Sequence, residues 1–189
     1  MVGAPEVELQ LDREDFLARY WQRKPALLPG ALKGFKPPLS SHQLAGLALE
    51  EDVESRIIEY RENAWVLHHG PFNNADFQRD HPWTLLVQAV DHFIPEVAEL
   101  RKLVDFIPQW RVDDIMVSYE VDGGSVGPHY DNYDVFLLQG EGQRRWKLGQ
   151  YCDGDSALLP HEELRILSLF EAEQEYLCLL YTSPSPRDS

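Results

Sequence analysis

One short loop between two apolar runs constrains the fold of this chain more than any other feature. The loop 127–131 reads Gly-Pro-His-Tyr-Asp and separates the apolar runs 115–119 and 135–138. Apolar runs of this length, bounded by glycine and proline, are typical of β-strands. Side chains two residues apart on an extended segment point to the same side, so His129 and Asp131 could coordinate one metal ion together.

The pattern of short apolar runs and glycine-containing turns predicts an antiparallel sandwich or barrel. The run from 133 to 139 is nearly continuously apolar, so we expect a strand that is buried on both faces. A turn at 140–142 leads into the next strand. The predicted strands are 55–60, 64–68, 115–121, 133–139 and 143–148.

Three helices are predicted from capping residues and apolar spacing. Asp12 can cap a helix that carries Phe16 and Trp21. Ser40 and Gln43 have the spacing of a capping box. A third helix is expected to begin at Pro82, because apolar residues then recur at 85, 86, 89, 90 and 93.

Bulk composition narrows the class of protein. The 189 residues are 43% hydrophobic, enough for one domain, or for one domain plus a fragment. The net charge of −15 argues against direct nucleic-acid binding. It would suit a basic protein partner, and solubility alone explains it equally well. There is no apolar run of bilayer-spanning length, and two cysteines make no disulfide framework. We expect no secretory signal, because residues 1–6 have neither a basic start nor an apolar stretch. We therefore expect no membrane association and a cytoplasmic location.

His129 and Asp131 supply two of the three ligands of a 2-His-1-carboxylate iron site. The spacing alone is a weak signal, and local hydrogen bonds within the loop are the alternative interpretation. His68 and His69 are adjacent and face opposite ways on a strand, so packing or solvent exposure is expected for them. His161 lies in a surface connection, and we do not expect it to be a ligand.

Arg144 and Arg145 follow on the next predicted strand, where only one of them can face the interior. A guanidinium group that binds a carboxylate through two hydrogen bonds would hold a dicarboxylate cosubstrate. Two solvated arginines on an edge strand are the alternative.

The chain resembles the bacterial JmjC-type, cupin-fold ribosomal oxygenases from about residue 8 to residue 177. The resemblance is densest in 127–136 and in Arg144-Arg145-Trp146, and the other matching segments are 15–25, 44–48, 69–72, 83–90 and 110–114. It implies an α+β fold in which N-terminal helices pack on a cupin or jelly-roll (double-stranded β-helix) sheet.

The resemblance also implies a reaction and its residues. His129 and Asp131 would be iron ligands, Arg144 would pair with the distal carboxylate of 2-oxoglutarate, and Ser118 would hydrogen-bond the same cosubstrate. The implied enzyme is an Fe(II)- and 2-oxoglutarate-dependent dioxygenase that hydroxylates an arginine of a large-subunit ribosomal protein. The implied partner is thus a basic ribosomal protein, and the parent protein is expected to be a homodimer through a region that this chain lacks.

The resemblance stops near residue 177, before the strand that carries the family's second iron-binding histidine. We expect a helix and strand segment over 1–95, the first part of the cupin core over 96–177, and a non-native tail over 178–189. The tail resembles a translated sequencing adaptor; a genuine Pro- and Ser-rich terminus is the alternative. We therefore expect an N-terminal fragment that is inactive by itself. A non-enzymatic cupin-like binding module and a histidine-directed ribosomal oxygenase are the other hypotheses.

Overall fold

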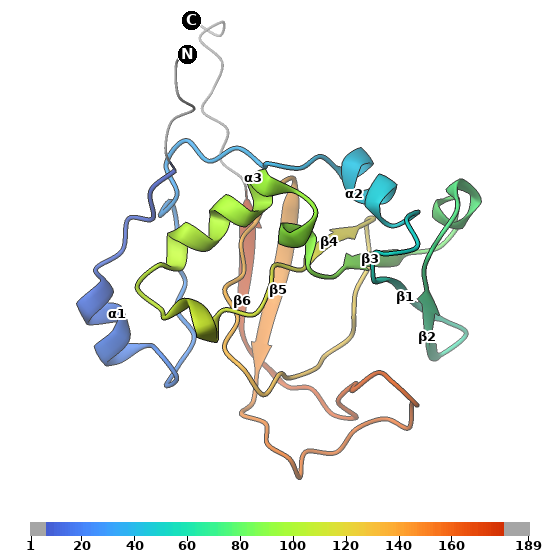
Figure 1. Ribbon diagram of the computed structural model, residues 1–189. Helices are drawn as coiled ribbons and strands as arrows, with labels where there is room; N and C mark the ends of the chain where they lie inside the picture. The colour runs from blue at the N-terminus through green and yellow to red at the C-terminus, as the bar shows by residue number, and fades with distance from the viewer. Residues whose placement is uncertain (1–6, 180–189) are drawn as a thin grey trace, which may run out of the picture. The chain divides into compact units, whose positions relative to one another are not determined.

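A computed structural model describes residues 7–179, which fold into two compact units (Figure 1). The larger unit contains residues 38–130 and 152–169. The smaller unit contains the N-terminal stretch to residue 37, residues 131–151, and the chain from residue 170 onward. The boundary between the two units falls between Tyr130 and Asp131, within the predicted His-x-Asp pattern.

The larger unit is built on a four-stranded antiparallel sheet. Its strands are β1 (Ser55–Arg61), β2 (Ala64–His69), β3 (Trp83–Val87) and β4 (Val117–Glu120), in the order β2-β1-β3-β4. The predicted strands at 55–60, 64–68 and 115–121 are therefore confirmed, the last in a shorter form. Glu62 and Asn63 turn the β1–β2 hairpin with positive φ angles of 55° and 62°, as a two-residue hairpin turn requires.

The two faces of this sheet differ in what covers them. On one face Ile57, Leu85 and Val87 join the hydrophobic core with residues of α2 (Ser41–Leu47). The capping box of Ser40 and Gln43 begins α2, as predicted. Residues directly opposite in an antiparallel sheet share a face, so Ile58, Thr84, Leu86 and Ser118 form the other face with Trp65 of β2.

The predicted helix from Pro82 to residue 93 is wrong. Residues 83–87 form β3, which pairs with β1 on one side and with β4 on the other. All five residues of β3 are buried. A strand buried on both faces has no alternation of polar and apolar residues, so its pattern cannot be told from that of a buried helix.

Short helices complete the larger unit between β2 and β4. They are η1 (Asn74–Phe77), η2 (Val90–His92), α3 (Pro95–Ala98), η3 (Glu99–Val104) and η4 (Gln109–Arg111). Asp91 of η2 ties this region to the segment just before β4, because its carboxylate accepts hydrogen bonds from Arg101 (2.9 Å) and from the Ile115 amide (2.8 Å). Within residues 7–179 the longest α-helices have seven residues, too short to cross a bilayer.

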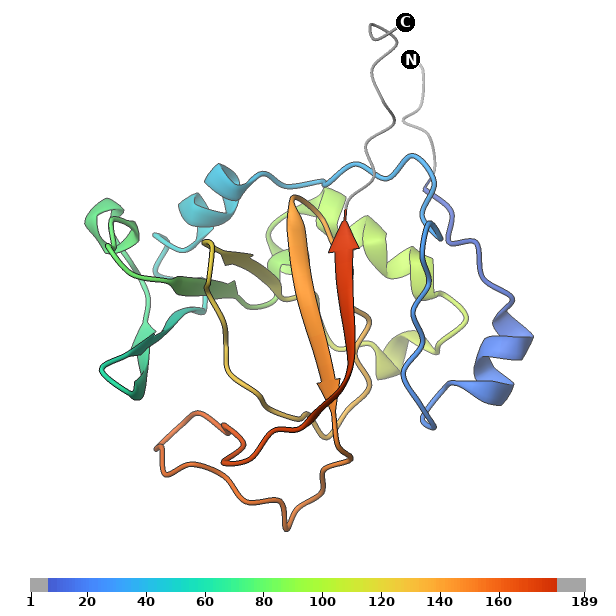
Figure 2. The same ribbon diagram turned by 180° about the vertical axis from the view of Figure 1, so that it is seen from behind.

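The smaller unit combines α1 (Arg13–Arg19) with the antiparallel pair β5 (Gln143–Gly149) and β6 (Ala172–Leu179). The side chain of Asp12 accepts a hydrogen bond from the Asp15 amide, which confirms the predicted cap of α1. β5 runs beside β6 in the opposite direction in both views (Figure 2). The strand predicted at 143–148 is confirmed.

The predicted strand at 133–139 is wrong. This segment has no strand structure, and its apolar side chains are exposed, Val135 by 51% and Leu137 by 60%. A strand buried on both faces needs a hydrogen-bonded neighbour, and none of the strands in residues 7–179 pairs with this segment. Phe136 makes aromatic contacts with Phe16 and Trp21 of the same unit.

The tail predicted over 178–189 falls mostly outside the described residues. Cys178 and Leu179 continue β6, opposite Arg144 and Gln143 of β5, so the expectation that the sheet ends before Cys178 is wrong by two residues. That the tail is non-native stays a prediction. The division of the sequence at residues 95 and 177 likewise stays a prediction.

Candidate functional site

The loop that carries His129, here called the ligand loop (residues 127–130), has a defined backbone. Gly127 begins it with a φ of +79°, a conformation that glycine adopts without strain. The Nδ1 atom of His129 lies 2.8 Å from the carbonyl oxygen of Gly127. A carbonyl oxygen only accepts hydrogen bonds, so Nδ1 carries the proton and the imidazole lone pair is on Nε2. This is the arrangement that histidine ligands of metal ions commonly have.

The four predicted site residues fall on both units. His129 and Ser118 belong to the larger unit, whereas Asp131 and Arg144 belong to the smaller one. In the larger unit, the position of a Cβ at Gly127 would be 2.9 Å from the Trp65 ring. The ligand loop therefore lies on the same face of the sheet as Ser118, which sits opposite Leu86. The structure brings Ser118 and the ligand loop to one face of the larger unit.

Arg144 and Arg145 point to opposite faces of β5, as the alternation of side chains along a strand predicts. Arg145 is 60% exposed and pairs with Glu175 of β6. Arg144 points to the other side, is half-buried, and has its guanidinium carbon 5.4 Å from the centre of the Trp146 ring. Of the two arginines, Arg144 is thus the one with a more enclosed side chain, which suits a carboxylate-binding role.

Two histidines outside the ligand loop, His69 and His161, have structural contacts. His69 hydrogen-bonds Glu163 at 2.8 Å, and His161 accepts the amide hydrogens of Glu163 and Leu164 through Nδ1. Among residues 7–179 no group of three or more His, Cys, Asp or Glu side chains is arranged so that it could hold a metal ion. The imidazole and carboxylate of His129 and Asp131 suit Fe(II), but they are two donors where a facial triad has three.

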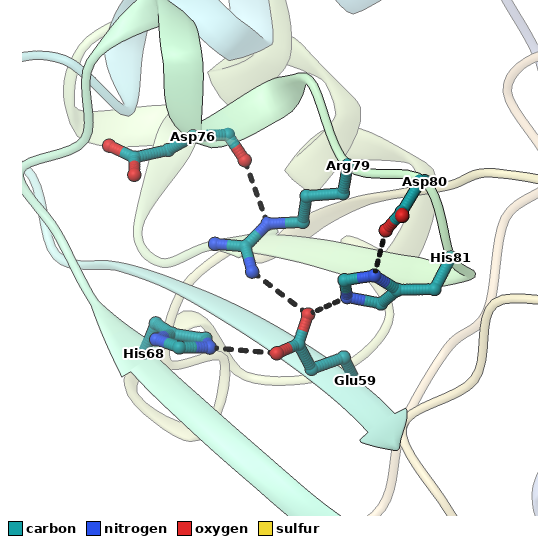
Figure 3. Close-up of polar contacts among 6 residues, drawn as sticks. All are labelled: Glu59, His68, Asp76, Arg79, Asp80 and His81. Atoms are coloured by element: carbon teal, nitrogen blue, oxygen red, sulfur yellow. Dashed lines mark hydrogen bonds and ion pairs between the residues drawn. The ribbon is translucent and has the colours of Figure 1, made fainter. Parts of the chain in front are cut away.

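A second polar cluster lies on the core side of the sheet and centres on Glu59 of β1 (Figure 3). The side chain of Glu59 is 2% exposed. One carboxylate oxygen hydrogen-bonds His68 at 3.0 Å, and the other contacts Arg79 at 2.8 Å and also His81. The other ring nitrogen of His81 contacts Asp80 at 2.9 Å. The cluster links β1 and β2 to the segment that precedes β3.

The cluster shifts the pKa values of its members. Burial by itself would raise the pKa of Glu59, but hydrogen bonds from His81 and His68 and the positive charge of Arg79 outweigh it and lower the pKa to about 2. The hydrogen bond to Glu59 raises the pKa of His81, and the one to Asp80 adds to that shift. Glu59 is therefore ionised at neutral pH and holds its partners by charge-assisted hydrogen bonds.

Sequence reasoning did not find two sets of contacts. One is the Glu59 cluster, whose only signal is a glutamate on the core side of a strand between apolar residues. The other joins the ligand loop to residues 165–167, where the Leu167 amide donates to the Pro128 carbonyl at 2.8 Å and Arg165 donates to the Tyr130 hydroxyl at 2.8 Å. The residues of each pair are 35 or more positions apart in the sequence, and no local pattern indicates them.

Known proteins match the chain over most of its length. Residues 99–180 match the JmjC domain model. The chain is 41% identical to the ribosomal protein uL16 3-hydroxylase of Escherichia coli over 95% of its length, and 41% identical to a probable ribosomal oxygenase of Haemophilus influenzae over 81%. It spans 49% and 38% of those two proteins, about half of their length or less.

The fold agrees with a solved structure as well. The structure of the E. coli ribosomal oxygenase YcfD in complex with cobalt and 2-oxoglutarate superposes with a TM-score of 0.80 at 40% identity. The match covers 92% of this chain and 45% of that protein. The mixed helix and antiparallel-sheet architecture predicted from the sequence is that of the JmjC cupin fold. The chain therefore contains a segment that matches the JmjC domain, and over most of its length it is similar in sequence and fold to part of these ribosomal oxygenases.

Proposed function

We propose that the protein carrying this chain is an Fe(II)- and 2-oxoglutarate-dependent oxygenase that hydroxylates an arginine side chain of a large-subunit ribosomal protein. The observation that carries the proposal is 41% identity to a uL16 3-hydroxylase over 95% of the chain. The complex of YcfD with cobalt and 2-oxoglutarate supports the choice of metal and cosubstrate, with cobalt standing in for iron. A cytoplasmic location agrees with a ribosomal substrate.

Each predicted site residue has a role in this proposal. His129, through Nε2, and Asp131 hold the iron, and the protonated Nδ1 keeps the imidazole oriented toward it. Arg144 binds the distal carboxylate of 2-oxoglutarate, and Ser118 donates a hydrogen bond to the same molecule. When bound, iron and 2-oxoglutarate supply the redox chemistry, and these residues bind and orient them.

The surface charge supports a basic protein as substrate. The chain carries 32 acidic and 17 basic residues, so it attracts a basic polypeptide at long range. A ribosomal protein rich in Lys and Arg fits this balance. Homodimerisation of the whole protein, and its failure to bind nucleic acid directly, stay predictions.

The test is conversion of 2-oxoglutarate to succinate by the whole protein, with a uL16-type ribosomal protein present. His129→Ala and Asp131→Ala should each abolish succinate formation, whereas the exposed pair His42→Ala and Asp52→Ala should leave it unchanged. Parent-level turnover in both ligand variants would refute the assignment. If the unsubstituted whole protein binds the ribosomal protein without forming succinate, the result would instead favour the hypothesis of a non-enzymatic binding module.

Arg144 gives an independent test with a control on the same strand. Arg144→Ala should raise the KM for 2-oxoglutarate at least about tenfold, because a charge-assisted carboxylate contact contributes about 1.5–3 kcal/mol. Arg145→Ala removes a guanidinium that is 60% exposed and points the other way, so its KM should stay at the parent value. Equal KM values for the two variants would move the cosubstrate contact to another residue.

A further inference from the structure

We propose that the segment 157–168, here called the strap, positions the ligand loop, and that Arg165 acts as a positioning residue for the two metal ligands through Tyr130. The inference rests on the proposed function, because it concerns the same pair of ligands. The strap lies in the connection between β5 and β6, and none of the predicted site residues lies in it. All of its contacts lie within the larger unit.

The strap has a structure of its own. Leu158 and Leu167 form an antiparallel bridge, and the Leu159 amide donates to the Ile166 carbonyl at 2.8 Å. The Ser168 amide closes the segment with a 3.0 Å hydrogen bond to the Ala157 carbonyl. Ile166 and Leu167 are buried. The strap is therefore a hydrogen-bonded hairpin with an apolar underside, and a segment of this kind can hold a neighbour in place.

The backbone of the strap holds the ligand loop directly before His129. The Leu167 amide donates to the Pro128 carbonyl at 2.8 Å. A Cβ at Gly127 would lie 2.7 Å from the Ile166 Cδ1 atom and 2.9 Å from the Trp65 ring. The start of the ligand loop is thus enclosed between the strap on one side and β2 on the other, with no room for a side chain.

A side-chain contact holds the residue between the two ligands. Arg165 donates from Nη2 to the Tyr130 hydroxyl at 2.8 Å, and its guanidinium carbon is 5.0 Å from the centre of the Tyr130 ring. A hydrogen bond and a cation–π contact to one ring restrict both the position and the tilt of that ring. Because His129 and Asp131 flank Tyr130 in the sequence, fixing Tyr130 restricts the backbone of both ligands.

The far end of the strap is tied to the sheet. The carboxylate of Glu163 accepts a hydrogen bond from the Nε2 atom of His69 at 2.8 Å. His69 ends β2, on the sheet face that also carries Trp65 and Ser118. The strap therefore spans from a sheet strand to the ligand loop, and groups that orient metal ligands in this way typically change metal affinity by about 10–100-fold when they are removed.

The test is a titration of the whole protein with Co(II), followed by the visible absorption of the bound ion. Arg165→Met should raise the Kd for Co(II) on the order of tenfold, and Arg165→Lys should restore part of the loss because it keeps a cation over the ring. Arg23→Met, an exposed arginine of the smaller unit, is the matched control and should bind as the parent does. Far-UV circular dichroism establishes that each variant is folded.

Tyr130→Phe provides a second variant should Arg165→Met fail to fold. It keeps the ring and the cation–π contact and removes only the hydrogen bond, so a smaller rise in Kd is expected. Parent-like Co(II) binding by folded Arg165→Met, or by Tyr130→Phe in its place, would overturn the inference about the strap.

His129→Ala separates this inference from the proposed function. If His129→Ala loses Co(II) binding while Arg165→Met binds Co(II) as the parent does, the proposed role of the strap is refuted and the ligand assignment stands. Parent-like Co(II) binding in His129→Ala itself would refute the ligand assignment on which both proposals stand.

Discussion

Replacement of Glu59 by glutamine should destabilise the larger unit strongly, even though the two side chains have nearly the same shape. The carboxylate of Glu59 accepts hydrogen bonds from His68, Arg79 and His81 at a site that is 2% exposed. Glutamine presents one acceptor and one donor group in place of two acceptor oxygens. Its NH2 group would therefore face at least one of these donors, and the Arg79 charge would lose its partner.

The pKa of Glu59 sets the size of the effect. A folded-state pKa of about 2 against an ordinary value of 4.5 corresponds to roughly 3 kcal/mol, at about 1.4 kcal/mol per unit. His68 is 40% exposed, and the solvent that reaches it screens part of this interaction. We therefore expect Glu59→Gln to lower the free energy of unfolding by about 2–3 kcal/mol at pH 7.

The pH dependence identifies the carboxylate as the cause. The pKa of Glu59 is lower in the folded state than in the unfolded state, so its contribution is complete above pH 4.5 and is lost as the pH falls toward 2. The pKa of His81 is raised, so its contribution is complete below its ordinary value of 6.5 and is lost as the pH rises through the raised value. The whole cluster should stabilise the fold most between about pH 4.5 and 6.5.

Urea unfolding of the parent and of Glu59→Gln at several pH values measures both effects. Glu173→Gln, an exposed glutamate of β6, is the control and should unfold within about 0.5 kcal/mol of the parent. The difference between the parent and Glu59→Gln should shrink steadily from pH 5 to pH 3. A difference below about 0.5 kcal/mol at pH 7, or one that does not change with pH, would refute the proposed role of the charge.

Two further substitutions test the backbone and the packing of the larger unit. Gly127→Ala should lower the free energy of unfolding in urea by about 2 kcal/mol or more, because it adds a clash to the strain of a φ of +79°. Gly30→Ala is the control, because Gly30 has a φ of +68° with open space around it, so that only the strain lowers its stability. Equal losses of stability in the two variants would argue against enclosure of the ligand loop. Asp91→Asn should cost about 3 kcal/mol, because it leaves the Arg101 guanidinium beside a neutral group in a buried pair; unchanged stability by thermal unfolding would show that the pair is dispensable.

Local signals in the sequence predicted the elements that depend on neighbouring residues. Asp12 and Ser40 begin helices because each side chain accepts an amide hydrogen three residues ahead. The β1–β2 hairpin follows from two apolar runs and a short polar turn at 62–63. These interactions span only a few residues, so their sequence patterns are sufficient to locate them.

The errors arose where distant partners decide the structure. Residues 83–87 are a strand because β1 and β4 lie on either side, and that information is not in the segment itself. Residues 133–139 have the composition of a buried strand, yet no strand within residues 7–179 pairs with them. For the site, the His-x-Asp spacing and the alternation of Arg144 and Arg145 were readable in the sequence. The contacts that hold Tyr130 and Pro128 were not, because their partners lie in the strap.

The most direct test of the proposed function is mass spectrometry of the uL16-type ribosomal protein after incubation with the whole protein, Fe(II) and 2-oxoglutarate. The parent should add one oxygen atom to an arginine of that protein, and His129→Ala should add none, while the exposed-histidine variant His42→Ala behaves as the parent. An oxygen atom on a histidine instead would correct the substrate residue. Unmodified ribosomal protein after incubation with a folded, metal-loaded parent, or full modification by His129→Ala, would contradict the proposal.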